Sequence, residues 1–303
     1  MINKFKMKHK KLILTHILKI IRPHQWVKNI LVFIPMLMSH NLNFNNFILS
    51  TKAFIIFSLV ASSIYVINDI VDIKSDQKHP YKKNRPLAAG LININQCKYL
   101  ILSLLLFCCL FLIDINKNFL ILIISYFAIS NLYTFVFKKY VIIDLLILAS
   151  LYTIRIIGGG FITDISVSIW LLSFSIFFFL SLAAIKRQIE IINFKKIKKG
   201  KITGRGYIVS DQKIINMIAI SAGYISILVL VLYINSPQVI SLYSSPNILW
   251  GMSLIMLFWI SRIMLMSSRK KIEDDPIVYA IKDIISYICL FLILCIMWLG
   301  ITI

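Results

Sequence analysis

The sequence predicts an all-α membrane protein that crosses the bilayer several times. Of its 303 residues 59% are hydrophobic and 15% are charged, whereas a soluble domain carries roughly a quarter of charged residues. Apolar stretches of about 15 to 22 residues recur along the whole chain, and about 20 such residues form a helix that crosses the hydrocarbon core. No linker rich in proline or glycine interrupts them, so residues 1–303 are expected to form one membrane domain.

Nine apolar stretches are expected to form the helices of a transmembrane bundle. Their approximate bounds are 25–40, 53–73, 97–114, 119–137, 141–160, 165–185, 214–234, 246–266 and 283–302. The first is short and contains Pro35, which blurs its limits. The preceding segment, 1–24, is basic and amphipathic and lacks a small-residue cleavage site, so we expect it to lie on the membrane surface.

The basic residues predict the orientation of the bundle. If the N-terminus is inside, 27 Lys and Arg lie in the internal segments 1–24, 74–96, 138–140, 186–213 and 267–282. The external connections then hold only Lys52 and Lys117. Because basic loops stay on the cytoplasmic side, we expect the N-terminus inside and the C-terminus outside, in an inner (plasma) membrane. The same rule accounts for the net charge of +21, which therefore does not indicate nucleic-acid binding.

The stretch NDIVDIKSD places Asn68, Asp69, Asp72 and Asp76 at the inner end of the second span. In a helix of about 3.6 residues per turn, all four share one broad face. Carboxylates so close together raise one another's pKa unless a cation neutralises them. Oxygen ligands suit Mg²⁺, which prefers to share its coordination with phosphates. The four residues are the candidate metal ligands, and Asp72 and Asp76 the candidate catalytic residues; the simpler alternative is a solvated acidic helix end.

A compact basic stretch, HPYKKNRPLAAG, follows the carboxylates and contains Lys82, Lys83 and Arg85. The arginine fork matches phosphate oxygens, and lysine supplies a movable point charge. A turn at residues 84–86 would aim the Arg85 guanidinium back at the aspartates. These three residues are therefore candidate phosphate ligands in loop 74–96. This loop and loop 186–213 are the long internal loops in which we expect the functional residues to gather. Positive charge retained on the inner face is the alternative.

NDIVDIKSD followed by NRPLAAG resembles the first signature of the UbiA superfamily of intramembrane prenyltransferases. The resemblance implies a nine-helix bundle that holds Mg²⁺ and a diphosphate over a lipid-lined cavity. In typical members a second Asp-x-x-x-Asp motif follows the sixth span. Here that place reads AAIKRQIEI and supplies Lys186, Arg187 and Glu190, so two cations and one acid replace a pair of carboxylates.

Four further segments are similar to the decaprenyl-phosphate phosphoribosyltransferase branch of that superfamily. They are IRPHQWVKNILVFIP, YTFVFKKYVIID, GRGY and DDPIVYAIKD. The similarity implies transfer of 5-phosphoribose from 5-phosphoribosyl 1-diphosphate to a polyprenyl phosphate with release of pyrophosphate, which makes a lipid-linked pentose donor for cell-envelope glycans. A site for a diphosphate, a 5-phosphate and a lipid phosphate needs more cations and fewer carboxylates, and Lys186 and Arg187 change the balance in that direction.

Single polar residues near the inner ends of the spans are further candidates. Lys28 is expected to contact either a phosphate or lipid headgroups. Lys138 is a candidate phosphate ligand and Asp144 a candidate for ordering Mg²⁺ or a ribose hydroxyl, unless the two neutralise one another. In GRGY, Arg205 is a candidate phosphate ligand. Tyr133, together with Asp144 and Glu190, is expected to support the site.

Two other polar residues have structural explanations. Arg155 lies about 16 Å beyond Asp144 on the same helix, too far to pair with it. As an arginine inside the membrane it is a functional candidate, and the structural alternative is a pair with Asp164. Asp275 precedes Pro276, a pattern typical of a helix N-cap.

Two other functions compete with phosphoribosyl transfer. An aromatic prenyltransferase of quinone or haem pathways would carry the second pair of carboxylates, which is absent here. A transporter would distribute polar residues along a pathway near the middle of the membrane. The stretches 97–114, 214–234 and 246–260 are nearly free of charge, which argues against transport. A homo-oligomer is compatible with all three functions.

Overall fold

The computed structural model describes residues 15–78, 82–195, 204–273 and 275–302, which are helical and contain no strand. Eight of the helices are long and apolar enough to cross a membrane. They are α3 (Phe44–Val71), α5 (Ile94–Phe111), α6 (Lys117–Phe135), α7 (Ile143–Thr163), α8 (Ile169–Lys195), α9 (Gln212–Ile234), α11 (Trp250–Ser268) and α13 (Ile284–Thr302). The expectation of an all-α polytopic membrane protein is confirmed.

The remaining elements are short. They are η1 (Pro23–Phe33), α2 (Ile34–Met38), α4 (Ile73–Gln77), η2 (Lys82–Asn84), η3 (Phe137–Lys139), η4 (Val209–Asp211), α10 (Pro237–Ile240), η5 (Pro246–Leu249) and α12 (Pro276–Ala280). Asparagine side chains begin three of the long helices: Asn43 accepts a hydrogen bond from the backbone N–H of Asn46, Asn93 from that of Gln96, and Asn116 from that of Phe119. These bonds satisfy N–H groups that the first turn of a helix leaves without partners.

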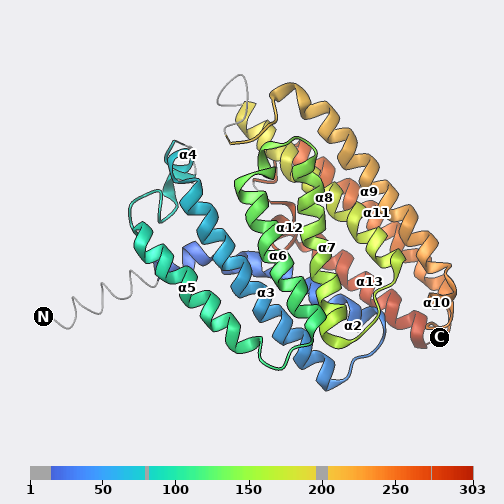
Figure 1. Cartoon of the computed structure of the whole chain (residues 1–303). Helices are drawn as coiled ribbons and strands as arrows, with labels where there is room; N and C mark the ends of the chain where they lie inside the picture. The colour runs from blue at the N-terminus through green and yellow to red at the C-terminus, as the bar shows by residue number, and fades with distance from the viewer. Residues whose placement is uncertain (1–14, 79–81, 196–203, 274, 303) are drawn as a thin grey trace, which may run out of the picture.

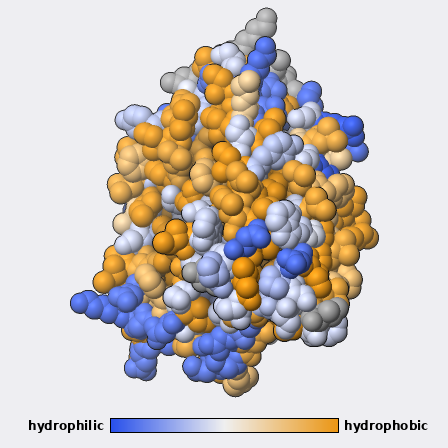
Figure 2. Space-filling view, turned by 90° about the vertical axis from the view of Figure 1, so that its right-hand side faces the viewer, coloured by the Kyte–Doolittle hydropathy of each residue, from blue (hydrophilic) through white to orange (hydrophobic). Residues whose placement is uncertain are grey.

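Helix α7 joins the two large hydrophobic cores of the bundle. One core contains buried residues of α7, α8, α9 and α11, and the other contains residues of η1, α3, α6 and α7. Figure 1 accordingly shows α7 and α8 in the middle, with α3 and α5 on one side and α9 and α11 on the other. Hydrophobic residues dominate the face in Figure 2, as expected for helices that contact lipid.

The first expected span, 25–40, is not one α-helix but the 3₁₀ helix η1 followed by α2. Pro35 has no N–H to bond the carbonyl of Leu31, and the N–H of Ile34 bonds that carbonyl in the tighter 3₁₀ pattern instead. Because a 3₁₀ helix rises ~2.0 Å per residue, η1 extends further than an α-helix of equal length. Eight helices rather than nine therefore meet the length and hydropathy requirements within the described residues.

Polar and aromatic contacts hold η1 antiparallel to α3. Trp26 donates to the Ser62 hydroxyl at 3.0 Å, and Asn29 donates to the Ser58 hydroxyl at 3.0 Å. Farther along, the Phe33 ring lies 6.4 Å from the Phe54 ring, between centroids. The segment thus follows α3 from the end that carries the acidic motif toward the opposite end of the bundle.

The other side of η1 packs against α7 at a glycine. A Cβ built on Gly159 would lie 2.0 Å from the backbone oxygen of Val32 in η1. Only a hydrogen atom fits between the two backbones at this position, so Gly159 allows η1 to pack directly against α7.

We therefore expect Gly159→Ala to push η1 away from α7 and to destabilise the fold by about 1–3 kcal/mol or more, the usual cost of overpacking. Gly158→Ala is the comparison variant, because its Cβ would lie 2.8 Å from the Phe57 ring, which is a side-chain contact rather than a contact with another backbone. Thermal unfolding of both variants in detergent would measure the difference. Equal unfolding temperatures would show that the Val32 contact does not require glycine.

Candidate functional site

The acidic motif lies where α3 meets α4. The motif was expected to lie on one continuous helix. Instead, α3 ends at Val71 and Asp72 occupies the junction with α4. Hydrogen bonds from Asp72 N to Asn68 O (2.9 Å) and from Asp76 N to Asp72 O (2.8 Å) nevertheless preserve the four-residue spacing. Asp69 and Asp76 lie on the same face, because one nitrogen of Arg85 reaches both.

Three basic side chains neutralise this first cluster. Arg85 Nη1 lies 3.1 Å from Asp69 Oδ1 and 2.6 Å from Asp76 Oδ2, so the Arg85 guanidinium points back at the motif as predicted. Lys138, on the turn between α6 and α7, places its Nζ 2.7 Å from Asp72 Oδ1. Arg22, the residue before η1, contacts Asp69. Burial raises the pKa of the Asp76 carboxyl, although the charges of Arg85 and Lys82 act in the opposite direction.

A second cluster surrounds Arg187 on α8. Its side chain is 0% exposed and lies between Asp144 of α7, at 2.6 Å from Nη2 to Oδ2, and Glu190 one turn further along α8. The contact with Asp144 is an ion pair rather than an aligned hydrogen bond. Tyr207 donates its hydroxyl proton to Asp144 and accepts the N–H of Ile142 at 3.0 Å. The burial of Arg187 favours a structural role over direct phosphate contact.

Arg205 and Tyr133 form the edge of the second cluster. Arg205 Nη1 donates to the Tyr133 hydroxyl at 2.7 Å, and Arg205 Nε lies 3.8 Å from Glu190 Oε2. Close packing sets this geometry, because a Cβ on Gly206 would lie 2.3 Å from the Lys139 carbonyl oxygen. Tyr133 therefore orients the side chain of Arg205, the candidate phosphate ligand, by accepting its hydrogen bond.

A third cluster consists of Asp275 and two lysines. Lys28 Nζ of η1 and Lys186 Nζ of α8 lie 2.6 and 3.0 Å from the same oxygen, Oδ2. The other oxygen accepts the N–H of Ile277 at 3.0 Å, so Asp275 is the expected N-cap as well. Burial raises the pKa of the Asp275 carboxyl, but the two lysines outweigh burial and hold that pKa well below its usual range.

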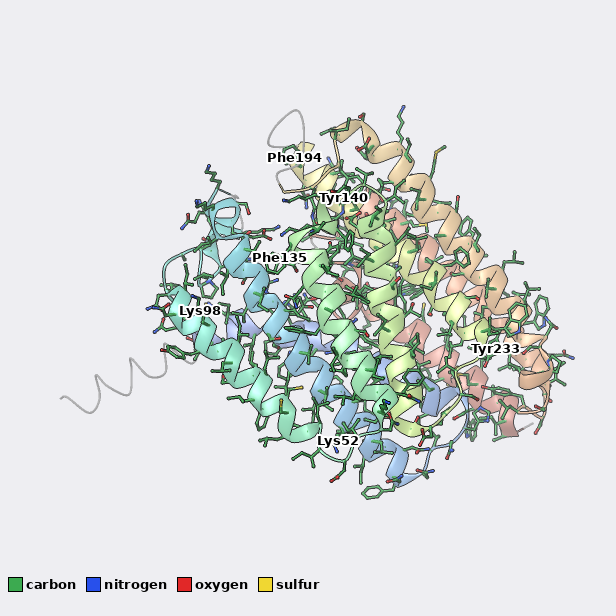
Figure 3. The ribbon with its side chains drawn as sticks, viewed as in Figure 1. Lys52, Lys98, Phe135, Tyr140, Phe194 and Tyr233 are labelled. Atoms are coloured by element: carbon green, nitrogen blue, oxygen red, sulfur yellow. The ribbon has the colours of Figure 1, made fainter. Side chains whose placement is uncertain are left out.

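Lys82 links the first two clusters. Burial lowers the pKa of the Lys82 ammonium group. The charges of both clusters also act on it: Glu190 and Asp76 raise this pKa, and Arg85 and Arg205 lower it. Lys186 and Arg187 are adjacent in α8, which links the second cluster to the third. Figure 3 shows Phe135, Tyr140 and Phe194 toward one end of the bundle. These residues are near Lys138 and Glu190 in the sequence. Lys52 and Tyr233 lie toward the other end.

The remaining predicted residues have simpler positions. Asn68 is half-buried near the end of α3, and Lys83 is exposed on η2. Lys138 and Asp144 do not neutralise one another, because Lys138 pairs with Asp72 and Asp144 with Arg187. The alternative of mutual neutralisation therefore does not hold, because the two side chains contact different helices.

For Arg155 the structural alternative was a pair with Asp164, and the structure gives it other partners. Its guanidinium is buried, donates to Asn29 Oδ1 at 2.7 Å and to the Tyr126 hydroxyl at 2.8 Å, and lies 5.6 Å from the centre of the Tyr152 ring. Asp164 is exposed at the end of α7. Arg155 thus binds η1 and α6 to α7, away from the acidic motif.

Two partners could not be found from local sequence. Arg22 was counted only as a basic residue of the inner face, and Asp275 was assigned only as a helix cap. Each contacts residues far along the chain: Arg22 reaches Asp69, and Asp275 reaches Lys28. The sequence indicated these contacts only by an arginine just before the first span, Arg22, and by an aspartate in the DDP stretch, Asp275.

The donor chemistry of the first cluster fits Mg²⁺. Asp69, Asp72 and Asp76 offer the hard oxygen ligands that this ion prefers. In the described residues, however, no three acidic, histidine or cysteine side chains already surround one point. Arg85 and Lys138 bond to carboxylate oxygens that an ion would use, so metal binding would replace some of these contacts.

Comparison with known proteins gives consistent matches. The sequence model of the UbiA prenyltransferase family matches residues 29–278. The uncharacterized protein y4nM of Sinorhizobium fredii is 32% identical over 88% of this chain and 52% of its own length. Nodulation protein NoeC of Azorhizobium caulinodans is 33% identical over 89% of this chain and 88% of its own length. The chain thus spans about half the length of y4nM and most of NoeC.

A named enzyme and a solved structure are also similar. Decaprenyl-phosphate phosphoribosyltransferase of Mycolicibacterium smegmatis is 35% identical over 58% of this chain and 57% of its own length. A UbiA homolog from Archaeoglobus fulgidus, bound to GPP and Mg²⁺, superposes with a TM-score of 0.67 and covers 93% of this chain and 99% of its own. At 15% identity, that likeness shows the fold alone.

Proposed function

Because the chain belongs to the UbiA prenyltransferase family, we propose that it transfers 5-phosphoribose from 5-phosphoribosyl 1-diphosphate to a polyprenyl phosphate and releases pyrophosphate. The observation that carries the proposal is the charge of the three clusters. Eight basic residues surround six carboxylates: Arg22, Lys28, Lys82, Arg85, Lys138, Lys186, Arg187 and Arg205 against Asp69, Asp72, Asp76, Asp144, Glu190 and Asp275. An excess of cations suits a reaction that brings three phosphate-bearing groups together. The similarity to decaprenyl-phosphate phosphoribosyltransferase supports the same reaction.

The reaction breaks the bond between ribose C1 and the pyrophosphate oxygen and forms a bond from C1 to an oxygen of the lipid phosphate. Arg85 and Lys138 are placed to hold the diphosphate, with Lys82 beside them. Mg²⁺ bound by Asp69, Asp72 and Asp76, with Asn68 adjacent, would stabilise the charge of the departing pyrophosphate. A polyprenyl phosphate is already ionised near neutral pH, so the chain has no proton to remove from the acceptor. Its residues contribute position and charge.

We propose that the protein lies in the inner (plasma) membrane and that its site faces the cytoplasm. The count of 27 internal against two external basic residues supports this orientation. Loops 74–96 and 186–213 supply Arg85, Glu190 and Arg205, although residues 79–81 and 196–203 lie outside the described part of the chain. The basic segment 1–24 is also mostly outside it. We propose one functional domain over 1–303 and, as product, a lipid-linked pentose donor for cell-envelope glycans.

The purified protein tests this proposal in detergent with Mg²⁺, labelled 5-phosphoribosyl 1-diphosphate and polyprenyl phosphate. We expect a labelled lipid and one pyrophosphate for each lipid formed, and no product when a chelator removes Mg²⁺. Prenylation of an aromatic acid with no use of the sugar donor would replace the proposal by the aromatic prenyltransferase alternative. Movement of label into sealed vesicles without formation of a lipid product would indicate a transporter.

A further inference from the structure

A pocket lies beside the third cluster, lined by Leu148, Tyr152, Leu182, Ala183, Lys186, Asp275, Pro276 and Ile277. We propose that Lys186, at the charged end of this pocket and with Lys28 beside it, binds the phosphate of the lipid acceptor, and that the hydrocarbon chain of the acceptor contacts the apolar lining residues. The inference rests on the proposed function, because it assigns one of the two substrates to a place in the site. We call it the Asp275 pocket.

The charged end of the Asp275 pocket is held in place from three directions. Asp275 Oδ1 caps the N-terminus of α12, and its Oδ2 accepts bonds from Lys28 of η1 and Lys186 of α8. Two ammonium groups therefore share one carboxylate oxygen. Their net charge is positive, so a phosphate can be bound without expelling the aspartate. Lys186 has 27% of its side chain exposed, against 6% for Lys28, and is the lysine placed to meet a ligand.

The walls of the pocket are apolar. Leu148 and Ala183 come from α7 and α8, and Ile277 comes from α12, which closes the pocket across from them. Leu148 and Tyr152 lie one and two turns beyond Asp144 on α7, ~6 and ~12 Å along the helix, so the pocket extends into the membrane-spanning part of the bundle. A phosphorylated sugar has no apolar part to bury there. An amphiphile with one phosphate and a hydrocarbon chain matches both ends of the pocket.

In this proposal, the two substrates bind to different clusters. The carboxylates of the first cluster, with Arg85 and Lys138, face the diphosphate donor. The adjacent residues Lys186 and Arg187 of α8 join the Asp275 pocket to the second cluster, because Lys186 contacts Asp275 and Arg187 contacts Asp144 and Glu190.

Binding of farnesyl phosphate to the purified full chain, without donor, tests the assignment. We expect Lys186→Met to raise the Kd for farnesyl phosphate about tenfold, which corresponds to the loss of one charge-assisted hydrogen bond. Farnesol should bind the variant and the parent alike, because it carries no phosphate. The Kd for 5-phosphoribosyl 1-diphosphate with Mg²⁺ should change less than about twofold. Lys186→Met leaves Asp275 paired with Lys28, so the fold should be retained.

Two variants control the experiment. Lys213→Met removes an exposed lysine at the start of α9 and should change neither Kd. Lys186→Arg keeps the charge and should restore most of the farnesyl phosphate binding, whereas a general packing defect would not be restored. If Lys186→Met weakens binding of the sugar donor and leaves farnesyl phosphate unchanged, the Asp275 pocket belongs to the donor and the assignment is overturned. If farnesyl phosphate binds in a Lys186-dependent way while the chain forms no product from the sugar donor, the proposed function fails and the lipid-phosphate pocket remains.

Discussion

Replacing Asp72 with asparagine is expected to lower turnover by about 10³-fold, comparable to removing one group that stabilises a transition state. Asp72 is the most exposed carboxylate of the motif, with 27% of its side chain accessible, and among the described residues it pairs with Lys138. Asparagine keeps the shape but loses the negative charge that would hold the divalent ion beside the departing pyrophosphate. The measurement is the initial rate of labelled lipid formation at saturating Mg²⁺ and donor.

The fold of the Asp72→Asn variant should be nearly unchanged. Lys138 is buried, but the amide oxygen of asparagine can still accept its hydrogen bond, so the lysine keeps a polar partner. Asp72 also occupies the junction between α3 and α4 at φ −92° and ψ 5°, a conformation that asparagine adopts readily. Asp164→Asn is the matched control, because it makes the same change at an exposed position far from the motif. Full activity of Asp72→Asn would remove Asp72 from the metal role.

Hydropathy predicted the helical bundle because lipid imposes one requirement on every span: about 20 apolar residues with all backbone groups bonded within the segment. Hydropathy does not distinguish an α-helix from a 3₁₀ helix. The form of η1 depends on Pro35 and on the contacts that Trp26 and Asn29 make with α3. Those contacts exist only once the bundle has assembled, so the first span was expected as an ordinary helix.

Local spacing predicted the parts of the site that lie on one stretch of chain. The seven-residue spacing placed Asp69 and Asp76 on one face, and the turn at residues 84–86 aimed Arg85 at them. Partners from distant segments could not be predicted in the same way. Lys28 and Asp275 are 247 residues apart, and only the packing of η1 against α12 and α8 brings them together.

The placement of Arg187 changes what its substitution should do. The sequence suggested a phosphate ligand, but the side chain is fully buried between Asp144 and Glu190. We expect Arg187→Met to destabilise the fold by about 3–5 kcal/mol, because removing one partner of a buried ion pair leaves an uncompensated charge. Lys186→Met, at the neighbouring position, should have a much smaller effect on stability because Lys28 still pairs with Asp275. Thermal unfolding of the two variants in detergent measures this difference.

A second substitution separates the structural role of Arg187 from a role in substrate binding. Asp144 is 0% exposed, and Tyr207 donates to it from the other side. Arg187→Met leaves Asp144 without a cation, whereas Glu190 keeps Arg205. Adding Asp144→Asn removes that uncompensated carboxylate, while the amide oxygen can still accept the Tyr207 proton. The double variant should therefore unfold at a higher temperature than Arg187→Met alone, since the two residues share one interaction and their effects are not additive. If Arg187→Met instead unfolds like the parent and only weakens binding of 5-phosphoribosyl 1-diphosphate, Arg187 is a phosphate ligand and the contacts with Asp144 and Glu190 do not stabilise the fold.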